Sequence, residues 1–201
     1  GCAAAAPIPD AALLPEWVRL QRSRVAAAVR MQKQRAVVLA ALRAAGVAAM
    51  PIKGIWLAEH VYADIVQRPM SDMDLLVRPA QIDAAQRVME GLGYAAAREN
   101  RPGGWGKERL FIHPQWRCGV EIQWSLWHPS HGLAPEQVLE RLWNAAGAGC
   151  ISGVEVQLLP PAAHLVYLAY HLQAHQWRFP ARAHLDLVLL GRRFAAELSA
   201  A

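Results

Sequence analysis

The chain has 201 residues, of which 54% are hydrophobic and 18% are charged, and its formal net charge at pH 7 is +5. This composition excludes an intrinsically disordered chain, and the length suits one medium-sized domain with its own core. No run of about 18 uncharged apolar residues occurs, so the sequence predicts no membrane span.

The first predicted element is a long helix, or two helices in series, over residues 10–44, with Asp10 as a candidate N-cap and Gly46 as the stop. Several apolar residues fall close to one face of this helix: Val18, Val25, Val29, Ala36, Leu39 and Leu42. The basic residues of segment 16–35 account for the whole positive excess of the chain: Arg19, Arg22, Arg24, Arg30, Lys33 and Arg35 against Glu16. We expect a solvated helix face there, and the alternative is a docking surface for an acidic partner or a nucleic acid.

The middle of the chain is typical of a mixed α/β core. Strands are predicted at 47–52, 72–77, 94–98, 108–112 and 119–126, with helices at 55–62 and 79–92. A helix at 135–143, a strand at 153–159 and helices at 161–176 and 181–195 follow. Few strands separated by helices favour a small mixed sheet packed by helices, so the predicted fold class is α/β, more closely α+β. The expected division is an N-terminal helical segment (1–46), a core (47–130) and a mostly helical C-terminal region (131–201).

Three carboxylates lie in the apolar strands of this core. Asp72 and Asp74 share one face of their strand because they are two residues apart, while Met73 and Leu75 point into the packing. Two carboxylates this close repel, and one takes up a proton unless a cation intervenes. Glu121 lies within another apolar strand, where an acid is costly unless it is paired or bound to a cation. If the two strands are neighbours, the three acids can hold two divalent metals, and oxygen ligands favour Mg²⁺, with Mn²⁺ as the alternative.

A structural explanation of the same acids stays open. Asp72 could cap a turn, and Glu121 could pair with an arginine at the edge of the sheet. The Asp-x-Asp pattern is also short and common, and metal-dependent glycosyltransferases use it too.

The stretch Pro51-Ile52-Lys53-Gly54 joins a predicted strand to a predicted helix. A glycine there lets a phosphate approach the backbone, the start of the helix supplies N–H donors, and Lys53 adds a full positive charge. Many strand–turn–helix junctions contain a glycine for purely structural reasons, so this motif is weak by itself.

Together these motifs resemble the pattern of the uncharacterised nucleotidyltransferase family, within the DNA polymerase β-like nucleotidyltransferase superfamily. The resemblance spans about residues 47–190. The residues that carry it are Lys53-Gly54, Tyr62, Arg68, the 72–77 strand, Gly93-Tyr94, the 120–124 strand, His171, His175, Trp177 and Asp186.

The resemblance implies a nucleotidyltransferase-fold core in which Asp72, Asp74 and Glu121 are the metal ligands and catalytic residues, with Glu121 helping to activate an acceptor hydroxyl. Gly54 would cradle the β- and γ-phosphates of a nucleotide. Lys53 and Arg68 would neutralise triphosphate charge. The expected reaction is Mg²⁺-dependent transfer of a nucleoside monophosphate from an NTP, with ATP as the first candidate, and release of pyrophosphate. The acceptor is left open among a small molecule, a peptide or protein, and an RNA.

The chain departs from the superfamily pattern at two positions. Ile55 follows Gly54, so the turn offers no hydroxyl to a phosphate, and Gln123 stands where relatives often have histidine. The alternatives to the enzyme are a non-catalytic nucleotide- or partner-binding module on the same fold and a metal-dependent glycosyltransferase. Three cysteines, odd in number and far apart, predict a reducing, cytoplasmic setting.

Histidines and tryptophans complete the set of candidates. His171 and His175 are four residues apart on a predicted helix, where packing or hydrogen bonding is expected. A zinc pair is the alternative, although Leu172 stands where a catalytic glutamate would follow the first histidine. Trp105 and Trp116 lie near the glycine-rich loop predicted at 101–106 and are candidates for stacking on a base or an acceptor.

Overall fold

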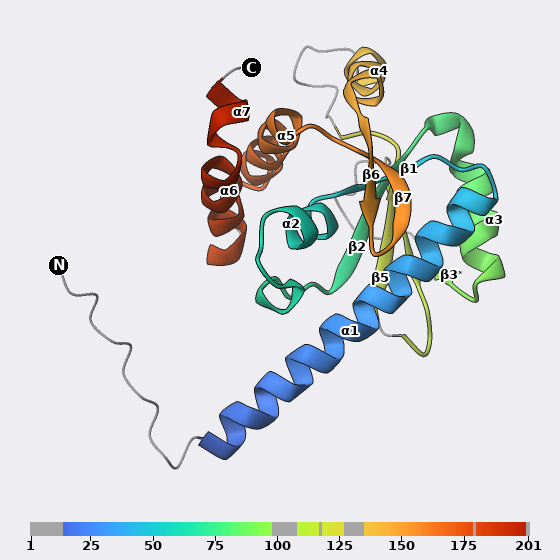
Figure 1. Cartoon of the computed structure of the whole chain (residues 1–201). Coiled ribbons are helices and arrows are strands. Elements are labelled where there is room, and N and C mark those ends of the chain that lie inside the picture. The colour runs from blue at the N-terminus through green and yellow to red at the C-terminus, as the bar shows by residue number, and fades with distance from the viewer. Residues whose placement is uncertain (1–13, 98–107, 117, 127–134, 179, 200–201) are drawn as a thin grey trace.

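The computed structural model describes residues 14–97, 108–116, 118–126, 135–178 and 180–199. Within them, a five-stranded mixed sheet has the order β1-β2-β5-β4-β3 (Figure 1). Its strands are β1 (Ala49–Ile52), β2 (Asp72–Val77), β3 (Ala95–Ala96), β4 (Glu108–Ile112) and β5 (Gly119–Gln123). β2 and β5 are parallel, and the other neighbours are antiparallel. β6 (Gly147–Ile151) and β7 (Val154–Leu158) form a separate antiparallel hairpin.

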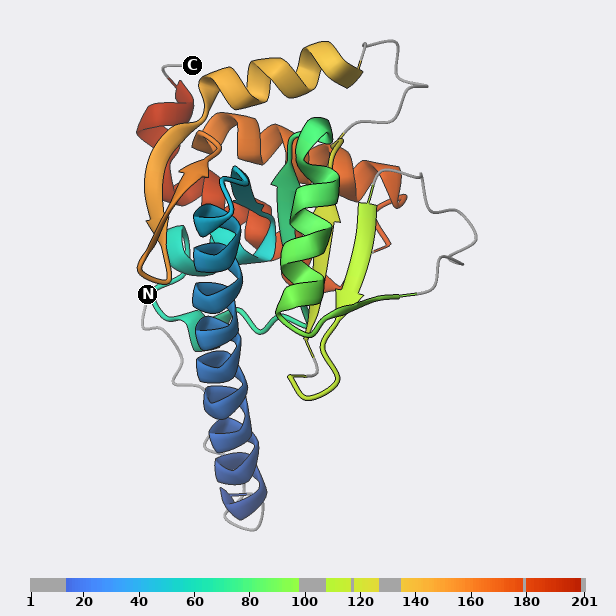
Figure 2. The same cartoon turned by 90° about the vertical axis from the view of Figure 1, so that its right-hand side faces the viewer.

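Helices cover both faces of the sheet. They are α1 (Leu14–Ala44), α2 (Gly54–His60), α3 (Ile82–Gly91), α4 (Pro135–Ala145), α5 (Pro161–Ala174), α6 (Ala181–Arg193) and α7 (Ala195–Ser199), with 3₁₀ turns at Ile65–Gln67 and Pro79–Gln81. Figure 2 views the sheet from the side of α1 and α3, with α5 and α6 behind it. No described helix combines the length and the apolar character that a membrane crossing requires.

The alternation of β2 divides the core between these two layers. Met73, Leu75 and Val77 join the cluster that α1 and α3 cover. Leu76 belongs to the cluster on the opposite face, which α4 and α5 cover. Asp74 therefore faces the side of the C-terminal helices, as the period of two along a strand requires.

The α/β class and the main strands were predicted correctly, but several boundaries were wrong. β6 was missed because its sequence, GAGCI, has no strand pattern; the turn at Ser152 and Gly153, both with positive φ, completes the hairpin. The strand expected at 94–98 has only two residues, and the one expected at 119–126 ends at Gln123. A 3₁₀ turn precedes α3, and the last expected helix breaks at Phe194. The division of the chain into three regions stays a prediction.

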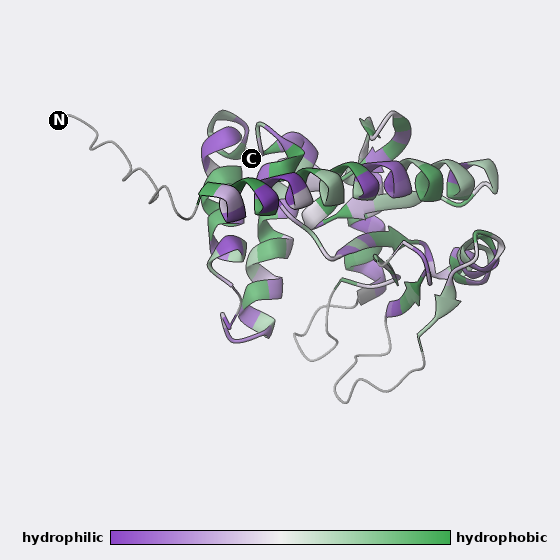
Figure 3. Cartoon of the chain, turned by 90° about the horizontal axis from the view of Figure 1, so that it is seen from below, coloured by the Kyte–Doolittle hydropathy of each residue, from purple (hydrophilic) through white to green (hydrophobic). Residues whose placement is uncertain are grey.

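The N-terminal half of α1 extends beyond the rest of the molecule, and polar and apolar residues alternate along it (Figures 2 and 3). Val18, Val25 and Val29, which belong to the predicted apolar face, are 37%, 46% and 43% exposed, so this part of the face does not join the core. The helix meets the core only from Met31 onward. Arg35, expected on the solvated basic face, is buried, and its Nη2 lies 3.3 Å from an oxygen of Glu59. Asp10 lies outside the described residues.

Candidate functional site

The register of β2 and β5 brings the predicted acids together. Asp74 is directly opposite Glu121 in the parallel pair, and Asp72, two residues earlier, is opposite Gly119. On the other side of β2, Asp74 pairs with Ile52, the last residue of β1. Lys53 follows Ile52 directly and therefore lies beside the acids. The two acidic strands are therefore neighbours, which is the condition for the three acids to share one site.

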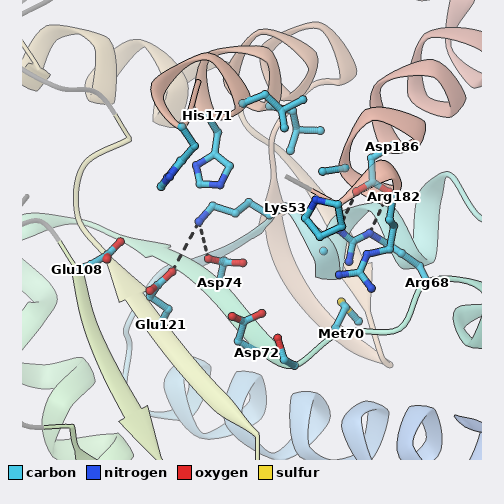
Figure 4. A pocket seen from close by; sticks show the side chains of 17 residues that line it. Lys53, Arg68, Met70, Asp72, Asp74, Glu108, Glu121, His171, Arg182 and Asp186 are labelled. Carbon is cyan, nitrogen blue, oxygen red and sulfur yellow. Dashed lines mark hydrogen bonds and ion pairs between the residues drawn. The ribbon is translucent and has the colours of Figure 1, made fainter. Parts of the chain in front are cut away.

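A cavity of about 430 Å³ opens at this place, and Figure 4 shows the side chains that line it. All six predicted site residues belong to its wall: Lys53, Gly54, Arg68, Asp72, Asp74 and Glu121. The facing wall comes from α5, α6 and the segment between them, and includes Leu168, His171, Leu172, His175, Arg182, Ala183 and Asp186. The site thus lies between the sheet and the C-terminal helices.

The ammonium group of Lys53 lies against two of the three carboxylates (Figure 4). Its Nζ is 2.7 Å from Oδ1 of Asp74 and 3.6 Å from Oε2 of Glu121, and the Lys53 side chain is only 14% exposed. Burial opposes the charged form of Lys53, but the neighbouring Tyr167, Asp74 and Glu121 outweigh it and raise its pKa. Lys53 is therefore a cation held inside the site.

Gln123 is the second donor to the same acids. Its Nε2 donates to Oδ1 of Asp74 at 2.9 Å and to Oε2 of Glu121 at 2.8 Å. The hydroxyl of Tyr167, from α5, donates to the amide oxygen of Gln123 at 3.3 Å, which fixes the orientation of the amide. Gln123 thus supplies one amide donor to both acids.

The three acids have different proton affinities. Burial raises the pKa of Asp74, but Lys53 and the hydrogen bonds from Glu121 and Lys53 outweigh it, so the pKa of Asp74 lies below its usual value. Burial, followed by the hydrogen bond to Asp74 and its charge, raises the pKa of Glu121 to about 7. Burial and then the charge of Asp74 raise the pKa of Asp72. Burial, and after it the proximity of Asp74, therefore makes Asp72 and Glu121 hold their protons more tightly than Asp74 does.

The donor set suits a hard divalent cation, because the carboxylates of Asp72, Asp74 and Glu121 line one cavity and a cation there would relieve the repulsion between Asp74 and the other two. Among the residues that the structure describes, however, no three His, Cys, Asp or Glu side chains are already gathered into a metal-binding group. The chemistry of the donors therefore fits a metal, and their arrangement would have to close around it.

The backbone that carries Lys53 is strained. Lys53 has φ 50° and ψ −122°, a conformation that favours glycine, and its N–H donates to Nε2 of His164 at 3.1 Å. His164 is fully buried and stacks on Trp56, with 4.4 Å between ring centroids. Burial, then the charges of His60 and Arg68, lower the pKa of His164 to about 3, so its imidazole is neutral and Nε2 can accept this bond.

Arg68 is fixed by a residue of α6. Asp186, only 2% exposed, accepts hydrogen bonds from Nε of Arg68 at 3.2 Å and from Nη2 at 2.8 Å, and from the hydroxyl of Tyr62 at 2.6 Å. The remaining nitrogen, Nη1, lies 2.7 Å from the position that a Cβ on Gly54 would take. A side chain at position 54 would therefore collide with Arg68, which explains the glycine of this turn.

Sequence reasoning left the role of Asp186 open and did not select Tyr167 or His164. Asp186 was marked only by the family pattern. His164 had a weak signal as a histidine on an apolar helix. Tyr167 had none, because its partner Gln123 lies 44 residues away.

His171 and His175 both line the cavity, with 4.9 Å between their ring centroids. Burial, and then the charges of Lys53 and His175, lower the pKa of His171 to about 3. Trp116 is 37% exposed, contacts the ring of His113 and is not part of the cavity wall. The stacking role of Trp116 stays a prediction, and Trp105 lies outside the described residues.

The mixed sheet, with acids on two adjacent strands behind a Lys-Gly turn, is the arrangement that the sequence resemblance to nucleotidyltransferases implies. A family model described as uncharacterised nucleotidyltransferase matches residues 3–201, and the chain belongs to that family. The resemblance seen in the sequence is thereby confirmed. A search of curated proteins finds no match.

Solved structures share the fold. The antibiotic-resistance factor ANT(2'')-Ia is 16% identical with a TM-score of 0.60, over 84% of this chain and 86% of that chain. The lincosamide antibiotic adenylyltransferase LnuA, solved with lincomycin bound, is 15% identical with a TM-score of 0.56, over 79% of this chain and 94% of that chain. An antigenic nucleotidyltransferase-like protein from Paracoccidioides brasiliensis is 14% identical with a TM-score of 0.53, over 80% of this chain and 75% of that chain. At identities this low, the structural similarity establishes the fold alone.

Proposed function

We propose that this chain is a Mg²⁺-dependent enzyme that transfers a nucleoside monophosphate from an NTP to a hydroxyl of an acceptor. The acceptor oxygen forms a bond to the α-phosphorus, the bond between that phosphorus and the oxygen bridging to the β-phosphate breaks, and pyrophosphate leaves with the bonding electrons. The observation that carries the proposal is that Asp72, Asp74 and Glu121, together with Lys53 and Arg68, line one cavity next to the glycine of the Lys53-Gly54 turn.

The residues take their roles from their positions. Gly54 lies in the cavity wall at the start of α2, where a phosphate would meet its backbone, and Lys53 and Arg68 supply positive charge for the triphosphate. Asp72, Asp74 and Glu121 are the proposed ligands of Mg²⁺, which when bound would neutralise phosphate charge, and Mn²⁺ is the alternative ion.

Glu121 is also the proposed acceptor of the hydroxyl proton. Its carboxylate lines the cavity directly opposite Asp74, where it can take up that proton. The proton that leaves the acceptor oxygen is thus accounted for by a side chain of the cavity wall.

We propose a small molecule as the acceptor and ATP as the donor. A cavity of about 430 Å³ lies within the size range of small-molecule sites. One similar structure is described as ANT(2'') -Ia in complex with adenylyl-2''-tobramycin, and another is described as a lincosamide antibiotic adenylyltransferase. A peptide, a protein or an RNA acceptor is the alternative. Cys118 and Cys150 are free thiols, which supports a reducing, cytoplasmic compartment.

A binding titration with each of the four NTPs, with and without Mg²⁺, tests the proposal on the wild type and on Asp74→Asn. We expect tight binding to need both Mg²⁺ and Asp74. The matched control is Glu155→Gln, whose side chain is exposed on the β6–β7 hairpin and should leave binding unchanged. Absence of binding for every NTP would contradict the proposal.

Turnover separates the enzyme from a non-catalytic nucleotide-binding module. The observation that favours such a module is that Lys53 forms ion pairs with Asp74 and Glu121. These are carboxylates that catalysis would need for the metal. Release of pyrophosphate in an acceptor screen supports the enzyme. Nucleotide binding with no product for any hydroxyl-bearing acceptor would favour the module. Full activity in Asp72→Asn, Asp74→Asn and Glu121→Gln alike would show that catalysis occurs at another site.

A further inference from the structure

We infer that Lys53 is a resident counter-cation of the acidic site, which a divalent metal must displace, so that metal and nucleotide bind together. This inference rests on the proposed function. It goes beyond the charge that Lys53 offers to a triphosphate, because it assigns the side chain two alternating partners: carboxylates in the free protein and phosphate oxygens in the complex.

The first step is competition for the same oxygens. Oδ1 of Asp74 already accepts from Lys53 at 2.7 Å and from Gln123 at 2.9 Å, and the Lys53 ammonium also lies 3.6 Å from Glu121. A metal bound to these carboxylates would face the ammonium at short range in a cavity of low dielectric constant, where two cations repel strongly. The side chain of Lys53 must therefore leave before a metal can bind there.

The second step is the cost of leaving. The Lys53 side chain is largely buried, and a buried ammonium without a counter-ion is strongly unfavourable. The cavity extends from the acids to Gly54 and Arg68, so an arriving triphosphate would offer Lys53 new negative partners within reach of its side chain (Figure 4). A metal alone would have to displace Lys53 and leave its ammonium without a counter-ion. When nucleotide binds with the metal, the phosphates replace the carboxylate partners that Lys53 loses.

The third step is that the backbone of Lys53 is held while its side chain can move. The N–H of Lys53 donates to the buried His164, which fixes the strained φ and ψ. Gln123 is held by Tyr167 and continues to donate to Asp74 and Glu121 when Lys53 moves away. The departure of Lys53 from the acids therefore needs rotation about its side-chain bonds, while the backbone of the turn stays in place.

The test measures Mn²⁺ binding by electron paramagnetic resonance without nucleotide, in the wild type, Lys53→Met and Lys53→Gln. We expect Mn²⁺ to bind about tenfold more tightly or better in both variants, because no ammonium competes for the carboxylates. Arg182→Met is the matched control: it removes one positive charge from the wall of the same cavity, on the side of α6. The inference requires that this control change Mn²⁺ affinity much less than Lys53→Met does.

A second arm adds α,β-methylene-ATP, which cannot release pyrophosphate. In the wild type we expect the analogue to tighten Mn²⁺ binding about tenfold or more, and in Lys53→Met we expect this enhancement to shrink. Thermal unfolding of each variant verifies that it is folded.

The two arms distinguish the two claims. Equal or weaker Mn²⁺ binding by both Lys53 variants without nucleotide, or an equal gain in Arg182→Met, would overturn the counter-cation role even if the wild type binds Mn²⁺ and nucleotide through Asp74. Failure of the wild type to bind the nucleotide analogue at all would instead overturn the proposed function, whatever the nucleotide-free comparison gives.

Discussion

Two arginine–carboxylate pairs of this protein allow burial to be tested as the source of ion-pair strength. Arg68 and Asp186 are 2.8 Å apart with side chains 11% and 3% exposed, whereas Arg43 and Glu155 are 2.6 Å apart with side chains 60% and 63% exposed. Removing one partner of a buried pair leaves the other charge without compensation and costs about 3–5 kcal/mol. Removing one partner of an exposed pair costs about 0–1 kcal/mol, since water replaces the partner.

We therefore expect Asp186→Asn to lower the free energy of unfolding by several kcal/mol and Glu155→Gln to change it hardly at all. Both substitutions remove one negative charge and keep the shape of the side chain. The hydroxyl of Tyr62 also loses a charged acceptor in Asp186→Asn, which adds about 1 kcal/mol.

Urea unfolding at pH 7.5, without metal or nucleotide, measures both values from the midpoint and the slope. Equal losses for the two variants would refute the argument from burial. A second readout concerns function: because Asp186 aligns Arg68 beside Gly54, Asp186→Asn should raise KM for the NTP more than it lowers kcat. A fall in kcat with KM unchanged would show that Asp186 does not act through nucleotide binding.

Three further outcomes are expected. The pKa of Glu121 is raised from 4.5 to about 7, so its ionised form destabilises the native state as pH rises through this window. Glu121→Gln should therefore abolish transfer but stabilise the metal-free protein at pH 8.5 by up to about 3 kcal/mol. In thermal unfolding this gain should vanish at pH 4.5, where the native carboxyl is protonated. Gly54→Ala should weaken NTP binding and cost about 1–3 kcal/mol in urea unfolding, because the new Cβ would lie 2.7 Å from a nitrogen of Arg68. Tyr167→Phe should lower kcat severalfold with little change in KM for NTP, since the Gln123 amide loses the contact that orients it.

Each of these expectations has a control or a contrary outcome. Gly91→Ala, in α3, meets no atom within 4 Å and should be neutral or slightly stabilising, so an equal loss there would contradict the collision argument for Gly54. A stability gain in Glu121→Gln that did not depend on pH would show that ionisation is not its cause. Unchanged kinetics in Tyr167→Phe would mean that Gln123 keeps its orientation without the hydroxyl.

The strand part of the site followed from the sequence because its rules are local. Asp72 and Asp74 are two residues apart on a strand, so they share a face. Glu121 was selected because an acid within an apolar strand needs a partner or a cation. The position of Lys53 and Gly54 at the end of β1 followed from a strand, a break and a helix in succession. These features depend on periods of two and on turn residues, which any single sequence displays.

The helical part of the site could not be predicted in the same way. A helix pattern shows which residues share a face but does not show which element that face will meet. Nothing local indicates that Asp186 meets Arg68, which lies 118 residues earlier in the chain. The same limitation explains why the burial of Arg35 was not predicted. A charged residue is expected at the surface, but α1 packs against the core at this point.

The contacts of α5 and α6 with the sheet also set the order in which the site can be completed during synthesis. The carboxylates, Lys53 and Arg68 all precede residue 122, and they leave the ribosome before His164, Tyr167 and Asp186 do. Until α6 has emerged, Arg68 lacks its buried partner and the strained turn lacks the imidazole that accepts its N–H. A shortened product of translation would thus carry the acids of the site without the support that aligns them, and nucleotide binding would report that the chain has been made through α6.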